Sequence, residues 1–219
     1  MEKKLSRIHS HTMELPRLIV VGNNNLSQLG KFLKTLSNPK KVSIISGENV
    51  KSILGEKIEK SLAVSKIKFR WELTTSNDPD SIKNIQKKLK KSNDDLLLGI
   101  GGGRSVDIAK ISAYKLKKSF VSVPTSASHD GMSSPFVSIR GEKPHSVIAT
   151  APLGVFVDVD VIKNAPRRLI SSGCGDLIAK ITAVKDWEIA SKKTGEYFGR
   201  YSANLALLSA KILTDNISN

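Results

Sequence analysis

The chain alternates short apolar runs with longer segments in which apolar residues recur every three or four positions. Short apolar runs are typical of strands buried on both faces of a parallel sheet, and the longer segments are typical of amphipathic helices. The pattern predicts strands at residues 18–22, 42–47, 69–74, 96–101 and 120–125. It predicts helices over residues 26–36, 79–91 and 105–118, and a further helical segment after residue 47 that includes residues 53 and 58. Because strands and helices alternate, we expect right-handed crossovers and a mainly parallel sheet.

The rhythm changes after residue 125. A hydroxyl-rich loop follows over residues 125–135, and a loop of this length is unusual unless it contacts something. Residues 136–140 and 146–150, joined by a turn at 141–144, predict a β-hairpin, and residues 155–162 predict one more strand. After Pro166 the pattern becomes helical. The chain therefore divides near Asn164 to Pro166 into an α/β part, residues 1–164, and a helical part, residues 165–219.

Residues 96–110 contain the most informative stretch, in which a buried strand runs into a glycine cluster and then into a helix. Gly101, Gly102 and Gly103 allow a tight turn and a close approach of a ligand to the backbone. Ser105 is expected to cap the helix, and Asp107 lies in its first turn, where the dipole favours an acid. This arrangement predicts an anion site, with a dinucleotide pyrophosphate as the anion. Three adjacent glycines differ from the spaced Gly-x-Gly-x-x-Gly fingerprint, so a purely structural turn stays an alternative.

Other ligand-type residues follow other predicted strands. Gly22, Gly47 and Thr125 each come at the end of a strand, as do the three glycines. Carboxyl ends of parallel strands meet at one edge of the sheet, and ligands bind beyond that edge. The sequence therefore predicts a single crevice there.

Composition limits the classes of protein that fit. The 219 residues are 39% hydrophobic and contain no run of about 18 apolar residues, so we expect no membrane span. The first residues, Met1–Leu5, lack the apolar core of a signal peptide, and a cytoplasmic location is expected. The single cysteine, Cys174, cannot form an internal disulfide, which agrees with a reducing compartment. We expect it to be a small packing residue.

The net charge of +15 has two interpretations. It would attract polyanions or a small phosphorylated molecule, or it reflects lysines on solvated helix faces. The densest run, residues 87–91, fits the carboxyl end of a helix, where lysines complement the dipole. Basic stretches are not interleaved with aromatic residues and no zinc-finger spacing occurs, which argues against nucleic-acid binding without removing it as an alternative.

Three blocks resemble the archaeal sn-glycerol-1-phosphate dehydrogenases, a branch of the metal-dependent glycerol dehydrogenase and dehydroquinate synthase superfamily. They are residues 101–110, 123–135 and 172–176, and the resemblance runs from Leu18 to the last residue. The first block is shared across the superfamily, whereas Ser128-His129-Asp130-Gly131 is diagnostic of this branch. The resemblance implies an α/β fold, with a Rossmann-like, mainly parallel sheet domain at 1–164 that binds a dinucleotide. It also implies that residues 165–219 begin an all-helical metal and substrate domain.

The resemblance further implies an activity: reduction of dihydroxyacetone phosphate by NADH or NADPH to sn-glycerol 1-phosphate, the backbone of archaeal membrane phospholipids. Asp130 and Asp176 would contact the substrate, and Asp176 would be the catalytic ligand of a Zn²⁺ ion that acts as a Lewis acid. The full-length protein would be a homo-oligomer. The implied cofactor-binding residues are Gly102, Gly103, Arg104, Ser105, Val106, Asp107, Thr125, Ser126, Ala127, Ser128 and Ser134.

Taken without the resemblance, the same residues have plainer interpretations. Asp176 follows Gly-Cys-Gly at an expected helix start and could be a partner of the helix dipole. Asp130 precedes a glycine and could be a turn residue. His129 and His145 flank loops and are expected to face solvent or to form hydrogen bonds rather than to bind metal.

The chain departs from the family in its histidines. The family takes two zinc ligands and another substrate contact from histidines downstream of Asp176, whereas the four histidines here all precede it. We therefore expect an incomplete, truncated enzyme that is inactive as it stands, and an apolar helix over 203–213 that needs partners to cover it. Alternatives are another polyol dehydrogenase, a dehydroquinate synthase-like enzyme, or a nucleotide-binding module without turnover. The sequence leaves the choice between NADH and NADPH open.

Overall fold

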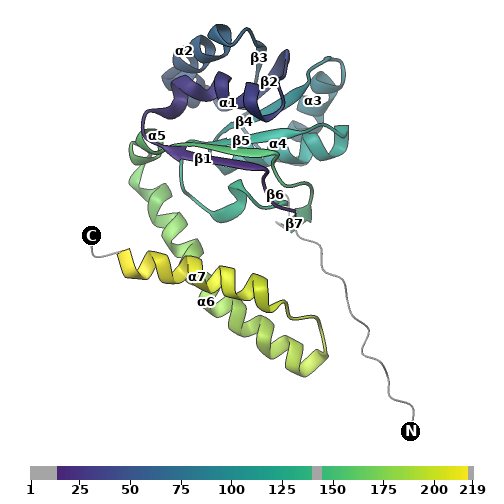
Figure 1. The fold of residues 1–219 in the computed structure, drawn as a ribbon. Coiled ribbons are helices and arrows are strands. Elements are labelled where there is room, and N and C mark those ends of the chain that lie inside the picture. Colours follow the sequence, from purple (N-terminus) through teal and green to yellow (C-terminus); the bar gives the residue numbers. More distant parts are fainter. Residues whose placement is uncertain (1–13, 140–144, 217–219) are drawn as a thin grey trace.

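A computed structural model describes residues 14–139 and 145–216 (Figure 1). Its centre is a six-stranded sheet in which all neighbouring strands are parallel. The strands lie in the order β1 (Leu18–Gly22), β8 (Gly154–Asp158), β5 (Phe120–Pro124), β4 (Leu96–Gly101), β2 (Lys41–Ser46) and β3 (Lys68–Leu73). The predicted α/β fold with a mainly parallel, Rossmann-like sheet is therefore confirmed.

Helices cover both faces of the sheet, which explains why the strands read as continuous apolar runs. One core contains side chains from α1 (Leu29–Leu36) and α2 (Glu48–Val64), and the other contains those of α3 (Pro79–Lys90) and α4 (Gly103–Leu116). Adjacent residues of β2 divide between them, since Ile44 packs in the first core and Ile45 in the second. The antiparallel hairpin of β6 (Phe136–Ile139) and β7 (His145–Ile148) adds Val137 to the second core. Its predicted turn at 141–144, like Arg140, lies outside the described residues.

Two predicted boundaries are wrong for reasons of capping. The run at 155–162 is not one strand, because β8 ends at Asp158 and the carboxylate of that residue accepts a hydrogen bond from the N–H of Asp160 (3.1 Å). This cap begins the short helix α5 (Val159–Lys163). Ser105 does not cap α4, since the N-cap is Gly102 and Ser105 already lies inside the helix. A 3₁₀ turn, η1 (Asn25–Gln28), also precedes α1.

The helices α6 (Arg167–Thr194) and α7 (Arg200–Asn216) pack side by side below the sheet (Figure 1). The Gly-Cys-Gly segment lies within α6, so Asp176 is in the third turn and is not the dipole partner at a helix start. Both helices expose large apolar side chains: Ile178, Ile181, Ile189, Leu205, Leu208 and Ile212. Over the described ranges, no helix combines the length and apolarity needed to cross a bilayer.

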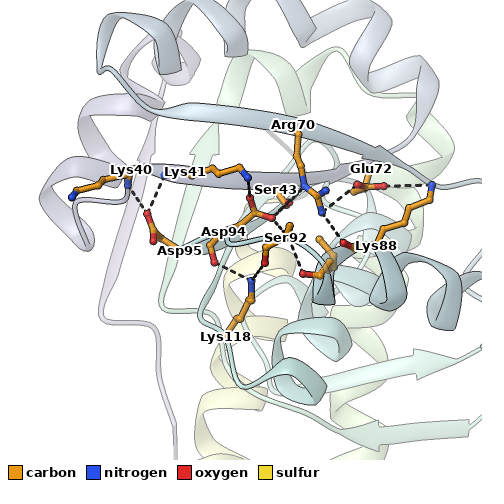
Figure 2. Close-up of polar contacts among 11 residues, drawn as sticks. Lys40, Lys41, Ser43, Arg70, Glu72, Lys88, Ser92, Asp94, Asp95 and Lys118 are labelled. Carbon is orange, nitrogen blue, oxygen red and sulfur yellow. Dashed lines mark hydrogen bonds and ion pairs between the residues drawn. The ribbon is translucent and has the colours of Figure 1, made fainter.

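A polar cluster ties the amino-terminal edge of the sheet together (Figure 2). We call Asp94 and its partners Ser43, Ser92, Arg70 and Lys41 the amino-edge cluster. The side chain of Asp94 is fully buried, accepts hydrogen bonds from the hydroxyls of Ser43 and Ser92, and lies 3.2 Å from Nε of Arg70 and 3.4 Å from Nζ of Lys41. Burial opposes the charge of Asp94, but the two hydroxyls and the two cations outweigh it and hold its pKa below the usual value.

Candidate functional site

The glycine turn lies where the ends of β4 and β5 meet. Gly101 has a φ of 149°, a conformation that residues with a Cβ rarely adopt, and a Cβ there would lie 2.6 Å from Oγ of Ser105. The N–H of Thr125 donates to the carbonyl of Gly101 (3.0 Å). The two blocks predicted to share a crevice are therefore joined by a hydrogen bond, and the turn is required by backbone geometry.

A cavity of about 650 Å³ opens above the start of α4, and we call it the glycine-turn cavity. Seven of the predicted cofactor residues line it: Gly102, Gly103, Arg104, Ser105, Asp107, Ser126 and Ser128. Oγ of Ser126 is buried and has no hydrogen-bond partner among the described residues. Orphaned buried hydroxyls call for an explanation, and a polar ligand in this cavity would provide one. Free N–H groups at a helix start suit the pyrophosphate of a dinucleotide, so these residues fit that cofactor.

The other four predicted cofactor residues lie around this cavity rather than in its described lining. Val106 is 1% exposed and packs in the core beneath α4. Thr125 makes the backbone bond described above, and Ala127 contacts α6. Ser134 lines a neighbouring cavity.

That neighbouring cavity, of about 510 Å³, brings together the two predicted substrate residues, and we call it the aspartate cavity. The N–H of Asp130, in the 3₁₀ turn η2 (Asp130–Met132), donates to Oδ2 of Asp176 (2.9 Å). Nζ of Lys180 lies 2.7 Å from the carboxylate of Asp130 and 3.8 Å from that of Asp176. Burial works to lower the pKa of Lys180, but the contact with Asp130 and the charge of Asp176 outweigh it, so the pKa is raised.

Gly173 explains how α6 reaches this site. It is the buried residue of the helix, and a Cβ on it would overlap the carbonyl oxygen of Ala127. The helix therefore packs directly on the backbone of the hydroxyl-rich loop, and Asp176 follows one turn later on the same side. Glycine at this position serves close packing rather than a helix start.

His129 lies between the two cavities and lines both. Its Nδ1 accepts a hydrogen bond from the N–H of Gly131 (2.8 Å), which assigns the ring hydrogen to Nε2. The ring covers Gly103, where a Cβ would collide with it. His129 is thus a hydrogen-bonding residue, as expected, while the side chain of His145 lies outside the description.

Two lysines that the sequence pattern does not single out, Lys110 and Lys180, lie at the site. Lys110 is fully buried, 3.5 Å from Asp107, and Lys180 contacts both aspartates of the aspartate cavity. Burial raises the pKa of Asp107 and lowers that of Lys110, each against the charge of the other. The spacings Asp107–Lys110 and Asp176–Lys180 place each pair on one helix face, and that signal could have found both.

The donor set for a metal is incomplete. Within residues 14–139 and 145–216, no three His, Cys, Asp or Glu side chains come together in a way that could hold a metal ion. Catalytic zinc sites use three protein ligands, so Asp176 does not hold Zn²⁺ with these residues alone.

Comparison with known proteins agrees with the fold and the motifs. Residues 20–166 match the family described as "Iron-containing alcohol dehydrogenase". The chain is 57% identical, over 100% of its length and 62% of the relative's, to "Glycerol-1-phosphate dehydrogenase [NAD(P)+]" from Nitrosopumilus maritimus. It is 48% identical to the protein of the same name from Metallosphaera sedula, covering 93% of this chain and 58% of that relative. The chain thus spans about three fifths of the curated relatives' length.

Solved structures show the same fold. A probable glycerol dehydrogenase from Sinorhizobium meliloti is similar with a TM-score of 0.82 and 22% identity, covering 95% of this chain and 58% of that one. Glycerol dehydrogenase from Schizosaccharomyces pombe gives a TM-score of 0.71 and 23% identity, covering 78% and 44%.

Proposed function

Because the chain belongs to the iron-containing alcohol dehydrogenase family, we propose that it forms the cofactor-binding part of an NAD(P)-dependent glycerol-1-phosphate dehydrogenase. The observation that carries this proposal is the shared wall of the two cavities. Asp107, His129 and Ser138 line both the glycine-turn cavity and the aspartate cavity. A dinucleotide in the first and a small polyol or ketone in the second would therefore be neighbours, as hydride transfer requires.

The residues at the start of α4 are proposed to hold the nucleotide. The backbone N–H groups of Gly103 and Arg104 would receive the pyrophosphate, with Ser126 and Ser128 donating from the loop. Val106, Thr125 and Ala127 would support this wall, and Ser134 would meet the nicotinamide end. When bound, the nicotinamide supplies the hydride.

The aspartate cavity is proposed to take the substrate, a small phosphorylated ketone such as dihydroxyacetone phosphate. Asp130 would accept a hydrogen bond from a substrate hydroxyl, and Lys180 offsets part of the negative charge of Asp130 and Asp176. Zn²⁺ at Asp176 would need further ligands, so we derive no step through it. For the same reason we propose that the 219-residue chain binds nucleotide without turnover.

The remaining parts of the proposal follow from the relatives' name and from the resemblance. Formation of glycerol 1-phosphate would serve synthesis of archaeal membrane lipids in the cytoplasm, with the whole protein as a homo-oligomer. The boundary between the nucleotide domain and the helical domain is proposed at 164–166, just before α6.

Two assays on matched proteins test the proposal. Calorimetry with NADPH and with NADH on the 219-residue chain should show saturable binding. A chimera that continues this chain with the carboxyl-terminal part of the Nitrosopumilus maritimus relative should reduce dihydroxyacetone phosphate in the presence of Zn²⁺, whereas the chain alone should not. A folded chimera that binds nucleotide but reduces only unphosphorylated ketones would reject the substrate.

A further inference from the structure

We propose that Lys110 is a positioning residue that clamps residues 131–138 onto α4, and that nucleotide binding depends on this clamp. The first half stands on contacts within the chain, and the second half rests on the proposed function. No part of the nucleotide or substrate chemistry above uses Lys110.

The contacts of Lys110 are unusual for a lysine. Its side chain is fully buried, and Nζ donates to the carbonyl oxygens of Gly131 (2.6 Å) and Phe136 (2.6 Å). A buried ammonium group is strongly destabilising unless it is paired and hydrogen-bonded. Since both hydrogen-bond acceptors are backbone atoms, the ammonium fixes the path of the chain rather than the rotamer of one side chain.

Asp107, one turn earlier on α4, completes the clamp. Its Oδ1 lies 3.5 Å from Nζ of Lys110, and its Oδ2 accepts a hydrogen bond from the N–H of Ser138 (3.2 Å). A single turn of α4 therefore holds the segment at three backbone positions, Gly131, Phe136 and Ser138. The ion pair supplies the counter-charge that permits the ammonium to be buried there.

The clamped segment forms part of both cavities. Gly131 directly follows Asp130, and Ser134 lies between the two carbonyls that Lys110 binds. Ser138 lines both cavities. Release of the segment would shift these groups together, so the clamp preorganises the wall that nucleotide and substrate share.

The test compares Lys110→Met with Lys118→Met. Lys118 is a matched control, because its Nζ also donates to two backbone carbonyls, those of Ser92 (3.3 Å) and Asp94 (3.0 Å), but at the opposite edge of the sheet. Three quantities are measured on the 219-residue chain: the thermal midpoint, the dissociation constant for NADPH, and hydrogen–deuterium exchange over residues 131–138.

Both variants should lower the thermal midpoint. Lys110→Met should also weaken NADPH binding by about tenfold or more, as residues that hold a ligand-binding group in place commonly do, and should speed exchange over 131–138. Lys118→Met should change neither. Unchanged binding and unchanged exchange in folded Lys110→Met would overturn the proposal. Faster exchange with unchanged NADPH affinity would reject the dependence of nucleotide binding on the clamp. If the wild type bound neither NADPH nor NADH, the proposed function would be rejected, and the exchange rates over residues 131–138 would still test the clamp.

A second variant covers the case in which Lys110→Met does not fold. In Asp107→Asn/Lys110→Met no lone buried charge remains, and the amide oxygen of the asparagine still accepts from Ser138. It should fold and still show faster exchange over 131–138, and wild-type exchange would contradict the clamp. The wild type offers one more check, because the Lys110 ammonium protons should exchange slowly in ¹⁵N-edited NMR, unlike those of exposed lysines. Rapid exchange at Lys110 would also contradict the clamp.

Discussion

Two aspartates, Asp94 and Asp107, lie at opposite edges of the same sheet, and both are buried. Asp94 is surrounded by two hydroxyls and two cations, which hold its pKa below the usual value (Figure 2). Asp107 faces one lysine and one backbone N–H, and burial raises its pKa. Hydrogen bonds and cations outweigh burial at the first carboxylate, whereas burial outweighs them at the second.

The difference matches the tasks of the two edges. The amino-edge cluster joins β2, β3 and the loop before β4, and its hydrogen bonds and ion pairs hold these three segments together, with Oδ1 of Asp94 held by its ion pair with Lys41 alone. The carboxyl edge keeps orphaned polar atoms, among them Oγ of Ser126, next to an open cavity. Groups left without partners at a cavity wall are available to a ligand. The comparison therefore separates a structural edge from a binding edge.

The largest expected effect comes from removing the acceptor at the amino edge. Asp94→Ala removes the buried acceptor of the Ser43 and Ser92 hydroxyls and one of the two carboxylates that pair with Arg70, so we expect the free energy of unfolding to fall by about 3 kcal/mol. NADPH binding by the folded protein should not change. Urea unfolding with calorimetry would check both, and Asp80→Ala, at an exposed ion pair, should stay within about 0.5 kcal/mol of the wild type. Loss of nucleotide affinity in Asp94→Ala would remove the distinction between the edges.

A smaller effect is expected where α6 meets the loop. In Gly173→Ala the new methyl group would overlap the carbonyl of Ala127, so α6 must shift, at a cost of about 1–3 kcal/mol. Gly175→Ala is the matched control, since nothing lies within 4 Å of a Cβ there and alanine favours helix by about 0.5–1 kcal/mol. Urea unfolding should thus give opposite signs for the two variants. Equal effects would show that α6 does not depend on this contact.

The two carboxylates should also respond oppositely to pH. The pKa of Asp94 is lowered on folding, so its contribution is present above the unfolded pKa of about 3.9 and is lost as pH falls through the folded value. The pKa of Asp107 is raised on folding, so its contribution is present at low pH and is lost as pH rises through the folded value. As the pH is lowered from about 6 to about 3, the wild type should therefore lose stability relative to Asp94→Asn and gain stability relative to Asp107→Asn. The free energy of unfolding of the three proteins, measured over this pH range, gives both trends. Trends of the same sign would contradict the opposite pKa shifts of Asp94 and Asp107.

The smallest effect is expected at Lys180. Its ion pairs with Asp130 and Asp176 are partly exposed, so Lys180→Met should change the free energy of unfolding by less than about 1 kcal/mol. Thermal unfolding at low and at high salt would check this, with the difference between wild type and variant shrinking as salt rises. A loss as large as that of Asp94→Ala would mean that the aspartate cavity is a structural cluster as well.

Much of the fold could be predicted from apolar periodicity, because strands buried on both faces carry an unmistakable apolar run. The β8 boundary could not, since Asp158 caps a helix inside an apolar stretch. The sequence places Gly173 at a helix start and does not reveal its close packing on Ala127, because that contact joins α6 to a loop far earlier in the chain.

The candidate site likewise contains parts that the sequence predicts and parts that it does not. The glycine turn and the hydroxyl-rich loop are local in sequence, and the structure places them together as predicted. Lys110 and Lys180 were missed because they are two among 35 lysines and arginines. Only tertiary structure shows which of these cations is buried.

The account depends on the carboxyl edge being the nucleotide site, and a crystal structure of the 219-residue chain with NADPH tests that most directly. It should show the pyrophosphate on the backbone N–H groups at the start of α4, Ser126 hydrogen-bonded to the ligand, and the nicotinamide directed toward Asp130 and Asp176. NADPH bound away from the glycine turn, or a glycine turn without ligand in crystals grown at saturating NADPH, would contradict this assignment.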